Sequence, residues 1–350
     1  MKPMRRKVKS LFRHRMTELL IIKPSSLGDI VHGLQVAASL KAQRSELRIA
    51  WIVRDLFESL VRTCEVVDRV YVFHRAEGVR GFVKLMREVR QTHYDYVFDM
   101  QGLLRTGLMT WRARAAHKVG RCDAREGATF FYSKKVPLPP AGAQSHALDV
   151  LLQFCPVLDA RPELRGELRF REAADLNLGF IDGPRGQKPI LIFPDSRRVE
   201  KRWNGFRQLT DLLLRDGSGR KVVWAGNNPV VYRDNAPDGQ FVNLTGNTSL
   251  VSLPALVRRA EWVISNDSGP MHLAAALGVK TLGLFGPTDP RLFGPYPPSS
   301  PTNHVVQAPV GDLRLLTARD VYARFARLDA ISRGQSPPGS AAPWPRRPWS

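Results

Sequence analysis

The sequence predicts two doubly wound α/β domains in tandem, each built on a largely parallel sheet. From residue 18 onward, short apolar segments alternate with longer segments whose apolar residues recur at helical spacing. A polar stretch at 171–188, with three glycines and one proline, interrupts the alternation, which restarts at residue 189. Alternating strands and helices imply right-handed crossovers and parallel strands, so the interruption divides the chain into two domains.

The expected elements follow the same order in both halves. In the first half, strands are predicted at 17–23, 47–53, 68–73 and 94–99, and helices at 29–43, 79–90, 106–116 and 145–154. In the second half, strands are predicted at 188–193, 220–226, 261–267 and 279–286, and helices at 203–217, 249–260, 268–278 and 317–328. The basic residues 1–15 are expected to form a solvated arm, and the Ser-, Pro- and Arg-rich residues 332–350 a tail.

Composition and charge narrow the class of protein. Hydrophobic residues make up 43% of the 350 residues and charged residues 24%, which is the composition of a soluble globular protein. The net charge of +21 predicts an anionic partner, whether nucleic acid, an anionic lipid surface or a phosphorylated substrate. The three cysteines form no C-x-x-C pair, which argues against a disulfide framework or zinc site and fits a reducing compartment. No apolar stretch is long enough to span a membrane.

Four polar segments follow predicted strands, at the sheet edge where doubly wound folds bind ligands. They are KPSSLGD (23–29), FPDSRRVEKRW (193–203), SNDSGPMH (265–272) and FGPTDP (285–290). The last of them either shapes a nucleotide site or simply turns the chain, and the sequence leaves both interpretations open.

SNDSGPMH predicts an anion site at a helix N-terminus. Asp267, Ser268 and Gly269 stand where unpaired backbone N–H groups attract anions, Gly269 permits close backbone approach, and His272 follows about one turn later. The segment FPDSRRVEKRW places Arg197, Lys201 and further cations where they would face that helix end and hold a diphosphate from the other side. The alternatives are a capped helix, which is compatible with binding, and a solvated basic loop.

Asp29 is the only carboxylate of the first strand-end segment. One role for it is to cap the helix that follows. The other is to face a crevice and take a proton. The chain has no P-loop, no G-x-G-x-x-G after a strand and no D-x-D for a divalent metal. If a diphosphate leaves here, its charge must be met by Lys, Arg and helix N-termini.

Over most of residues 17–328, the order and spacing of these segments resemble glycosyltransferase family 9, the bacterial heptosyltransferases of lipopolysaccharide core assembly. The motifs that carry the resemblance are IIKPSSLGDIVH, YDYVFDMQGLLRTG, EKRW, ISNDSGPMHLAAALG and LFGPTDP. The stretch VGRCDAREGATFFYSKK looks closest to the heptosyltransferase I branch.

The resemblance implies a GT-B fold, in which two Rossmann-like domains face each other across a cleft. Residues 16–172 would bind the acceptor and residues 189–331 the nucleotide sugar, with a linker at 173–188. The implied reaction is inverting, needs neither metal nor cofactor, and moves heptose from ADP-heptose to the Kdo of lipid A. The implied location is cytoplasmic, peripheral on the inner face of the cytoplasmic membrane and in contact with its anionic surface.

The resemblance also assigns roles to residues. Asp29 corresponds to the proposed catalytic base, and Gly28 is expected to leave room beside it for a sugar. Lys201 corresponds to the cation that contacts the donor diphosphate. The other donor contacts implied are Ser196, Arg197, Thr248, Asp267, Ser268, Gly269 and His272. Ser26, Arg105 and Arg125 are expected to contact the acceptor, as part of a basic surface on the first domain that suits its carboxylates and phosphates.

One position departs from the family pattern, and three alternatives stay open. Val230 stands where family members often carry an acidic residue, which leaves the ribose contact and the exact nucleotide undetermined. The alternatives are a family transferase with another acceptor such as heptose, a nucleotide-sugar epimerase and a nucleic-acid binder. Asp29 argues against the epimerase, and the lack of any recognised nucleic-acid motif argues against the last.

Overall fold

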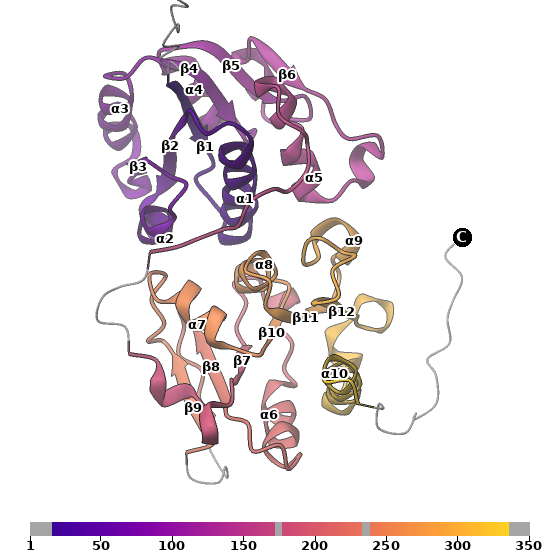
Figure 1. Cartoon of the computed structure of the whole chain (residues 1–350). Coiled ribbons are helices and arrows are strands. Elements are labelled where there is room, and N and C mark those ends of the chain that lie inside the picture. The colour runs from indigo at the N-terminus through magenta and orange to yellow at the C-terminus, as the bar shows by residue number, and fades with distance from the viewer. Residues whose placement is uncertain (1–15, 172–176, 233–238, 336–350) are drawn as a thin grey trace, which may run out of the picture.

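Two six-stranded parallel sheets, one in each half of the chain, form the frame of the molecule (Figure 1). The computed structural model describes residues 16–171, 177–232 and 239–335. The predicted arm 1–15 and most of the predicted tail lie outside the described residues. So does the start of the predicted linker.

The first domain has the strands β1 (Thr17–Ile22), β2 (Leu47–Arg54), β3 (Arg69–Phe73), β4 (Tyr94–Asp99), β5 (Ala115–Arg121) and β6 (Lys134–Val136). Its α-helices are α1 (Leu27–Gln43), α2 (Glu58–Thr63), α3 (Gly78–Val89), α4 (Leu104–Arg112) and α5 (Ala147–Leu152). The strand order is β3-β2-β1-β4-β5-β6. The order reverses at β1, so the end of β1 is the topological switch point at which such sheets bind ligands.

The second domain has the strands β7 (Ile190–Phe193), β8 (Val222–Gly226), β9 (Phe241–Thr245), β10 (Trp262–Asn266), β11 (Lys280–Phe285) and β12 (Asn303–Gln307). Its α-helices are α6 (Phe206–Leu214), α7 (Leu253–Arg259), α8 (Gly269–Ala276), α9 (Pro290–Phe293) and α10 (Ala318–Ser332). The strand order is β12-β11-β10-β7-β8-β9, which repeats the arrangement of the first sheet.

The eight predicted strands are all present, but β5, β6, β9 and β12 were not predicted from the sequence. Three of them lie at sheet edges and β5 lies next to one, where only part of each strand is buried. Partly buried strands accept polar residues, and β5 contains His117, Lys118 and Arg121. For the same reason the helix predicted at 106–116 was too long, since α4 ends at Arg112 and β5 begins at Ala115.

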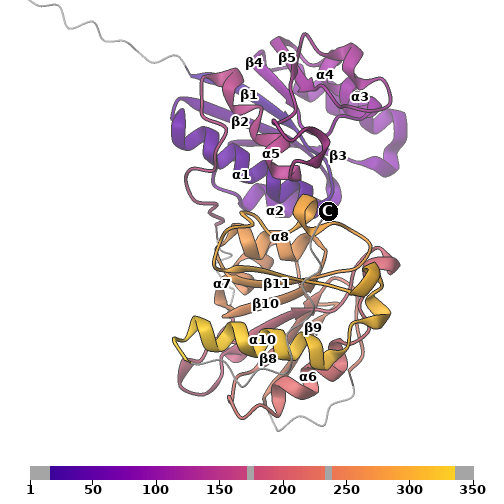
Figure 2. The same ribbon diagram turned by 90° about the vertical axis from the view of Figure 1, so that its right-hand side faces the viewer.

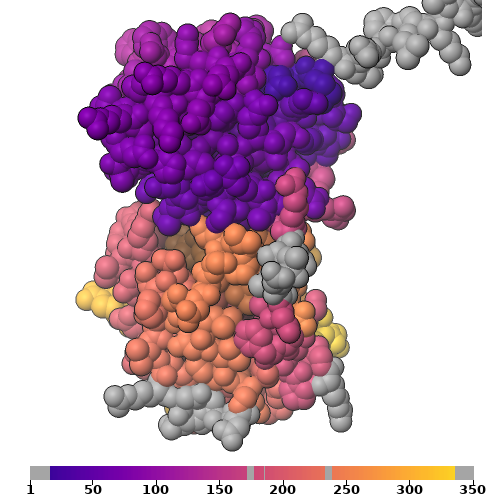
Figure 3. Space-filling model, turned by 90° about the vertical axis from the view of Figure 1, so that its left-hand side faces the viewer, coloured from indigo at the N-terminus to yellow at the C-terminus, as the bar shows by residue number. Residues whose placement is uncertain are grey.

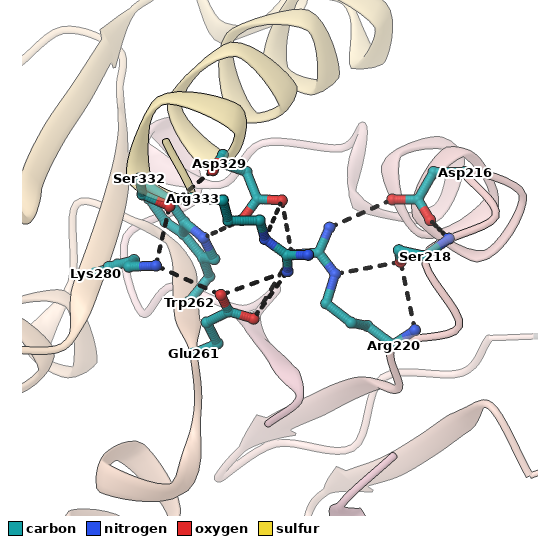
Figure 4. A network of polar contacts seen from close by, with 9 residues as sticks. All are labelled: Asp216, Ser218, Arg220, Glu261, Trp262, Lys280, Asp329, Ser332 and Arg333. Carbon is teal, nitrogen blue, oxygen red and sulfur yellow. Dashed lines mark hydrogen bonds and ion pairs between the residues drawn. The ribbon is translucent and has the colours of Figure 1, made fainter. Parts of the chain in front are cut away.

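The second domain also extends beyond its predicted boundary at residue 331. Ser332 ends α10, and the Arg333 guanidinium pairs with the Glu261 carboxylate at 3.2 Å. A buried guanidinium, Arg220, lies at the centre of this region, with Asp216, Asp329 and Glu261 around it (Figure 4). This network holds α10 against the residues that precede the strands of the second sheet. It lies at the edge of that sheet that faces away from the first domain, and its role there is structural.

The two domains meet through the N-terminal parts of α1 and α8 (Figure 2). Helix α1 is buried on almost every side from Gly28 to Leu40, because α8 of the second domain covers its first turns and α5 and residues 161–165 cover the rest. Three further bonds join the domains: His146 Nε2 lies 3.1 Å from the Gly294 carbonyl oxygen, the Tyr296 hydroxyl donates to Asp149 at 2.7 Å, and Arg258 donates to the Leu168 carbonyl oxygen at 2.9 Å. Figure 3 shows the domains as two lobes with a recess at their junction.

Candidate active site

Asp29 lies in the first turn of α1, directly after the switch point at the end of β1. Its Oδ2 atom accepts hydrogen bonds from the Ser26 backbone N–H at 3.0 Å and from the Ser26 hydroxyl at 2.7 Å. Its Oδ1 atom lies 3.2 Å from the Lys23 ammonium, and 43% of the side chain remains exposed. Asp29 therefore caps the helix and still presents a carboxylate to solvent.

The surroundings of Asp29 keep it ionised. Burial disfavours the charged form, but the Lys23 ammonium and the two bonds from Ser26 outweigh that effect and hold the pKa of Asp29 well below its usual value. A carboxylate of this kind is always ready to accept a proton at neutral pH, although it is a weak base.

Lys23 is a site residue that the sequence analysis missed. Its side chain is only 2% exposed, and its ammonium donates to the Met100 carbonyl oxygen at 3.0 Å as well as pairing with Asp29. The signal was present in the sequence, because Lys23 is a single cation at the end of the apolar run LLII. A buried cation is stable only with partners, so Lys23 and Asp29 hold each other in place.

On the second domain, Lys201 and Asp267 form the counterpart of this arrangement. The Lys201 ammonium contacts Asp267 Oδ2 at 2.5 Å, and both side chains are largely buried. The Thr288 hydroxyl, from the segment FGPTDP, donates to the same Oδ2 at 2.6 Å. That contact shows that FGPTDP does more than turn the chain, because it holds the carboxylate next to Lys201.

The other predicted donor residues gather at the same edge of the second sheet. Ser268 is the N-cap of α8, and its hydroxyl lies 3.0 Å from that of Ser265. Ser196 is buried and follows β7, while Arg197 beside it is exposed. The Thr248 hydroxyl joins the ends of β8 and β9, accepting from the Gly226 N–H and donating to the Leu244 carbonyl oxygen.

The position next to Gly28 is not open to a sugar, so that expectation was wrong. A Cβ atom at Gly28 would lie 2.6 Å from His272 Cδ2, across the domain junction. Similarly, a Cβ atom at Gly269 would lie 2.5 Å from Leu27 Cγ. Both glycines allow α1 and α8 to approach closely, and a substrate must therefore reach Asp29 from its exposed side.

A pair of histidines lies at the centre of this junction. His32 Nε2 of α1 is 3.1 Å from His272 Nδ1 of α8, and His146 packs edge-on against His32. Burial lowers the pKa of His272 to about 4, with the charges of His146 and Lys201 adding to this and those of Asp267 and Asp29 opposing it. Burial, together with His272 and His146, also holds the pKa of His32 well below its usual value. His32 ends the motif IIKPSSLGDIVH, but the sequence indicated no role for it.

The histidine pair predicts that the junction is sensitive to acid. An exposed histidine takes up a proton near pH 6.5, whereas His272 in the closed junction does so only near pH 4. Between these values the unfolded or opened state binds more protons, so stability is lost as the pH falls and is unaffected by this group above 6.5. We expect the melting temperature of the wild type to fall over this window, and that of His32→Gln to fall less. Equal pH profiles for the two proteins would show that the pair does not control the junction.

The predicted acceptor residues lie on the first domain, at the edge of the sheet where the strands end and α1 begins. Strand β4 pairs with β1 so that Asp99 lies opposite Ile22. Beyond the end of β4, the Arg105 guanidinium lies 5.6 Å from the centre of the Phe73 ring, and the Arg125 N–H donates to the Gly102 carbonyl oxygen at 2.9 Å. Both arginines are therefore at the sheet edge that carries Asp29. The hydroxyl of Ser26, in contrast, already donates to Asp29.

The environment of Val230 explains how a residue other than an acid is accommodated there. Its side chain packs against the core of the second domain, and its N–H donates to the Thr245 hydroxyl at 2.9 Å. Within the described residues, no three His, Cys, Asp or Glu side chains gather as a metal site would require. None of the helices in the described ranges is both long and apolar enough to cross a bilayer.

Comparisons with known proteins agree with this arrangement. A family model described as glycosyltransferase family 9 (heptosyltransferase) matches residues 82–310. Lipopolysaccharide heptosyltransferase 1 of Escherichia coli strain RS218 is 27% identical over 320 residues, covering 87% of this chain and 95% of the relative. Lipopolysaccharide heptosyltransferase 1 of Pseudomonas aeruginosa is 28% identical over 298 residues, covering 79% of this chain and 81% of the relative.

Among solved structures, E. coli heptosyltransferase WaaC with ADP superposes with a TM-score of 0.73. The two chains are 23% identical, and the match covers 89% of this chain and all of WaaC. This likeness, together with the two six-stranded parallel sheets, confirms the GT-B fold predicted from the sequence.

Proposed function

Because the chain belongs to glycosyltransferase family 9, we propose that it transfers heptose from ADP-heptose to the Kdo of lipid A, in the inner core of lipopolysaccharide. The observation that carries this proposal is the close contact of α1 and α8, where His32 Nε2 lies 3.1 Å from His272 Nδ1 and Gly28 meets the His272 ring. Asp29 in the first turn of α1 and the Lys201–Asp267 pair beside the start of α8 belong to this same junction, as the proposal requires of a proton acceptor from one domain and a cation for the diphosphate from the other. The family match also argues against the epimerase alternative.

The donor would bind to the second domain. The negatively charged diphosphate would bind to Lys201 beside Asp267, because an ammonium group has three N–H donors, and Thr288 and Lys201 would continue to hold the Asp267 carboxylate. The N-terminus of α8 adds backbone N–H groups near Ser268 and Gly269. Ser196, Arg197, Thr248 and His272 complete the proposed donor contacts.

The reaction requires one displacement, with inversion at the anomeric carbon of the heptose. An acceptor hydroxyl attacks that carbon as the bond to the diphosphate breaks, Asp29 accepts the hydroxyl proton, and ADP departs with the bonding electron pair. Lys201 and the α8 N-terminus stabilise the charge that grows on the leaving oxygen, as fixed donors do in the absence of a metal. The low pKa of Asp29 means that proton transfer occurs late, when the hydroxyl is already partly bonded to the sugar.

The acceptor would bind to the first domain, with its carboxylates and phosphates near Arg105 and Arg125. Heptose as the acceptor is the remaining alternative within the family. An enzyme of this kind would work in the cytoplasm, against the inner face of the cytoplasmic membrane. The decisive test is to incubate the full chain with a panel of nucleotide sugars and with Kdo-lipid A or heptosylated lipid A, and to follow products by mass. If heptose is added only to heptosylated lipid A, the acceptor sugar is heptose and not Kdo.

Replacing Arg125 by Ala is expected to weaken binding of the acceptor without weakening binding of the donor. The side chain is exposed on the first domain and pairs with no carboxylate within the described residues, so the fold should tolerate its loss. We expect KM for the acceptor to rise and ADP affinity to stay unchanged. Raising the salt concentration should reduce the difference between the two proteins, because salt screens exposed charges. Parallel losses for donor and acceptor would place Arg125 outside the acceptor site.

A further inference from the structure

Helix α4 exposes apolar residues on its outward face, in addition to the Met109 side chain that it buries. Its buried residues are Met109 together with Thr106, Gly107 and Thr110, and Gly107 lies against Phe131 and Ala128. The outward face carries Leu104 and Trp111, which are 44% and 53% exposed, with Leu108 between them at the i+4 position. A solvated surface helix places such residues inward, so this face is suited to a partner.

The apolar residues continue on both neighbours of α4. On one side, Phe130 is 89% exposed in the short 3-10 turn Ala128–Phe131, whose Phe131 ring lies against that of Trp111. On the other side, the C-terminal ends of α3 and α4 are joined by a bond from Arg90 Nη1 to the Arg112 carbonyl oxygen. Helices α3 and α4 also share one hydrophobic cluster beneath them and are adjacent in Figure 2.

These residues define one surface, which we call the α3–α4 face. Its exposed apolar residues are Val79, Val83, Leu104, Trp111 and Phe130. Its cations are Arg75, Arg80, Arg87, Arg90, Arg105 and Arg112, and its acid is Glu77. Lys84 and Glu88 lie on the other side of α3, toward Glu58 and Arg62 of α2. Within the described residues, none of the cations of the α3–α4 face forms an ion pair with a carboxylate. The Arg112 guanidinium instead lies 5.5 Å from the centre of the Trp111 ring.

We propose that the α3–α4 face docks onto an anionic lipid bilayer. Exposed Trp and Phe side chains suit the boundary between headgroups and acyl chains, while Arg and Lys side chains reach the phosphates. Each cation near an anionic surface adds to the attraction. A second copy of the same face would bring like charges together, and a nucleic acid would leave the aliphatic residues of α3 and α4 exposed to water.

The inference rests on the proposed function, and it specifies how the active site would be oriented relative to the bilayer. Helix α4 begins just beyond the end of β4, next to β1 and Asp29, and Arg105 stands in its first turn. A molecule docked through the α3–α4 face would therefore hold the acceptor side of the junction near the headgroups. A lipid-linked acceptor would then reach Asp29 without leaving the bilayer.

The experiment is vesicle flotation of the full chain, with vesicles of phosphatidylcholine alone or in equimolar mixture with phosphatidylglycerol, and no acceptor present. We expect binding to the mixed vesicles only. The double variant Trp111→Ser/Phe130→Ser and the double variant Arg80→Glu/Arg87→Glu should each lower partitioning by about 10-fold or more. The matched controls are Leu315→Ser/Val310→Ser, with similar exposure on the second domain, and Arg319→Glu/Arg327→Glu on α10. Both controls should bind as the wild type does.

A second measurement does not depend on how the serine variants fold. Brominated lipid quenches the fluorescence of a tryptophan that enters the bilayer, so wild type and Trp111→Phe can be compared directly. We expect quenching in the wild type that Trp111→Phe loses. Quenching that is equal in both proteins, flotation that is unchanged in both double variants, or tighter binding to a single-stranded oligonucleotide than to mixed vesicles would overturn the assignment.

Failure of this inference is distinguishable from failure of the proposed function. Trp111→Ser/Phe130→Ser should keep normal turnover on acceptor dispersed in detergent and lose turnover on acceptor held in mixed vesicles. A wild type that floats with vesicles yet transfers no heptose would contradict the proposed function and leave the docking surface in place. A wild type that transfers heptose equally well in both formats, with or without the two aromatic residues, would contradict the docking surface alone.

Discussion

Asp29→Asn is expected to lower kcat by at least about 10²-fold, within the range for loss of a general base. The asparagine oxygen still accepts the Ser26 N–H, so the first turn of α1 stays capped. What is lost is the ability to take the proton of the acceptor hydroxyl. Binding of ADP, which depends on the other domain, should remain normal.

The same substitution has a structural cost that the sequence alone did not indicate. The Lys23 ammonium is buried and would keep only the Met100 carbonyl oxygen as a partner. A buried charge without its counterion is destabilising, so we expect a lower melting temperature for Asp29→Asn. Turnover must therefore be measured well below that temperature, with folding checked by circular dichroism.

Asp123→Asn is a suitable control, because it removes a carboxylate from the same domain that pairs with Arg121 on the surface. It should keep near-normal turnover. If Asp29→Asn also turns over normally while folded, Asp29 serves only as a cap and as the partner of Lys23, and the base lies elsewhere.

Lys201→Ala is expected to lower turnover by about 10² or more, as the loss of a fixed charge-stabilising donor does. Negative charge grows on the leaving diphosphate oxygen in the transition state, and Lys201 is the cation placed to meet it. Activity of the wild type should survive EDTA. Complete dependence on added Mg²⁺ would contradict this part of the mechanism.

The structure again adds a second consequence. Lys201 neutralises Asp267, whose side chain is only 5% exposed and would otherwise have the Thr288 hydroxyl as its partner. Lys201→Ala should therefore also be less stable, and ADP should stabilise it less than it stabilises the wild type. Arg198→Ala is the matched control, since Arg198 lies in the same loop and pairs with Glu200 in solvent. Equal losses in the two variants would indicate a general effect of charge on the loop.

Most of the strands and helices could be predicted from the sequence because their hydrophobic patterns are local. The central strands are buried on both faces and read as short apolar runs, and α1, α6 and α8 follow them with helical spacing. The edge strands β6, β9 and β12 have little apolar pattern, because only part of each is buried. Their pairing is decided by neighbours that lie far away in the sequence.

In the candidate site, too, some features could be predicted from the sequence and others could not. By itself, the sequence determined that Asp29, Lys201 and Asp267 follow strands and stand at the ligand-binding edges of two sheets, because their positions depend on chain order alone. Only the tertiary structure decided what occupies the space between them. Gly28 meets His272, and Thr288 bonds to Asp267. The exposed apolar side of α4 likewise became visible only once the sheet had covered the other. Each of these facts depends on two segments being brought together by packing, and such contacts leave no spacing in the sequence from which to read them.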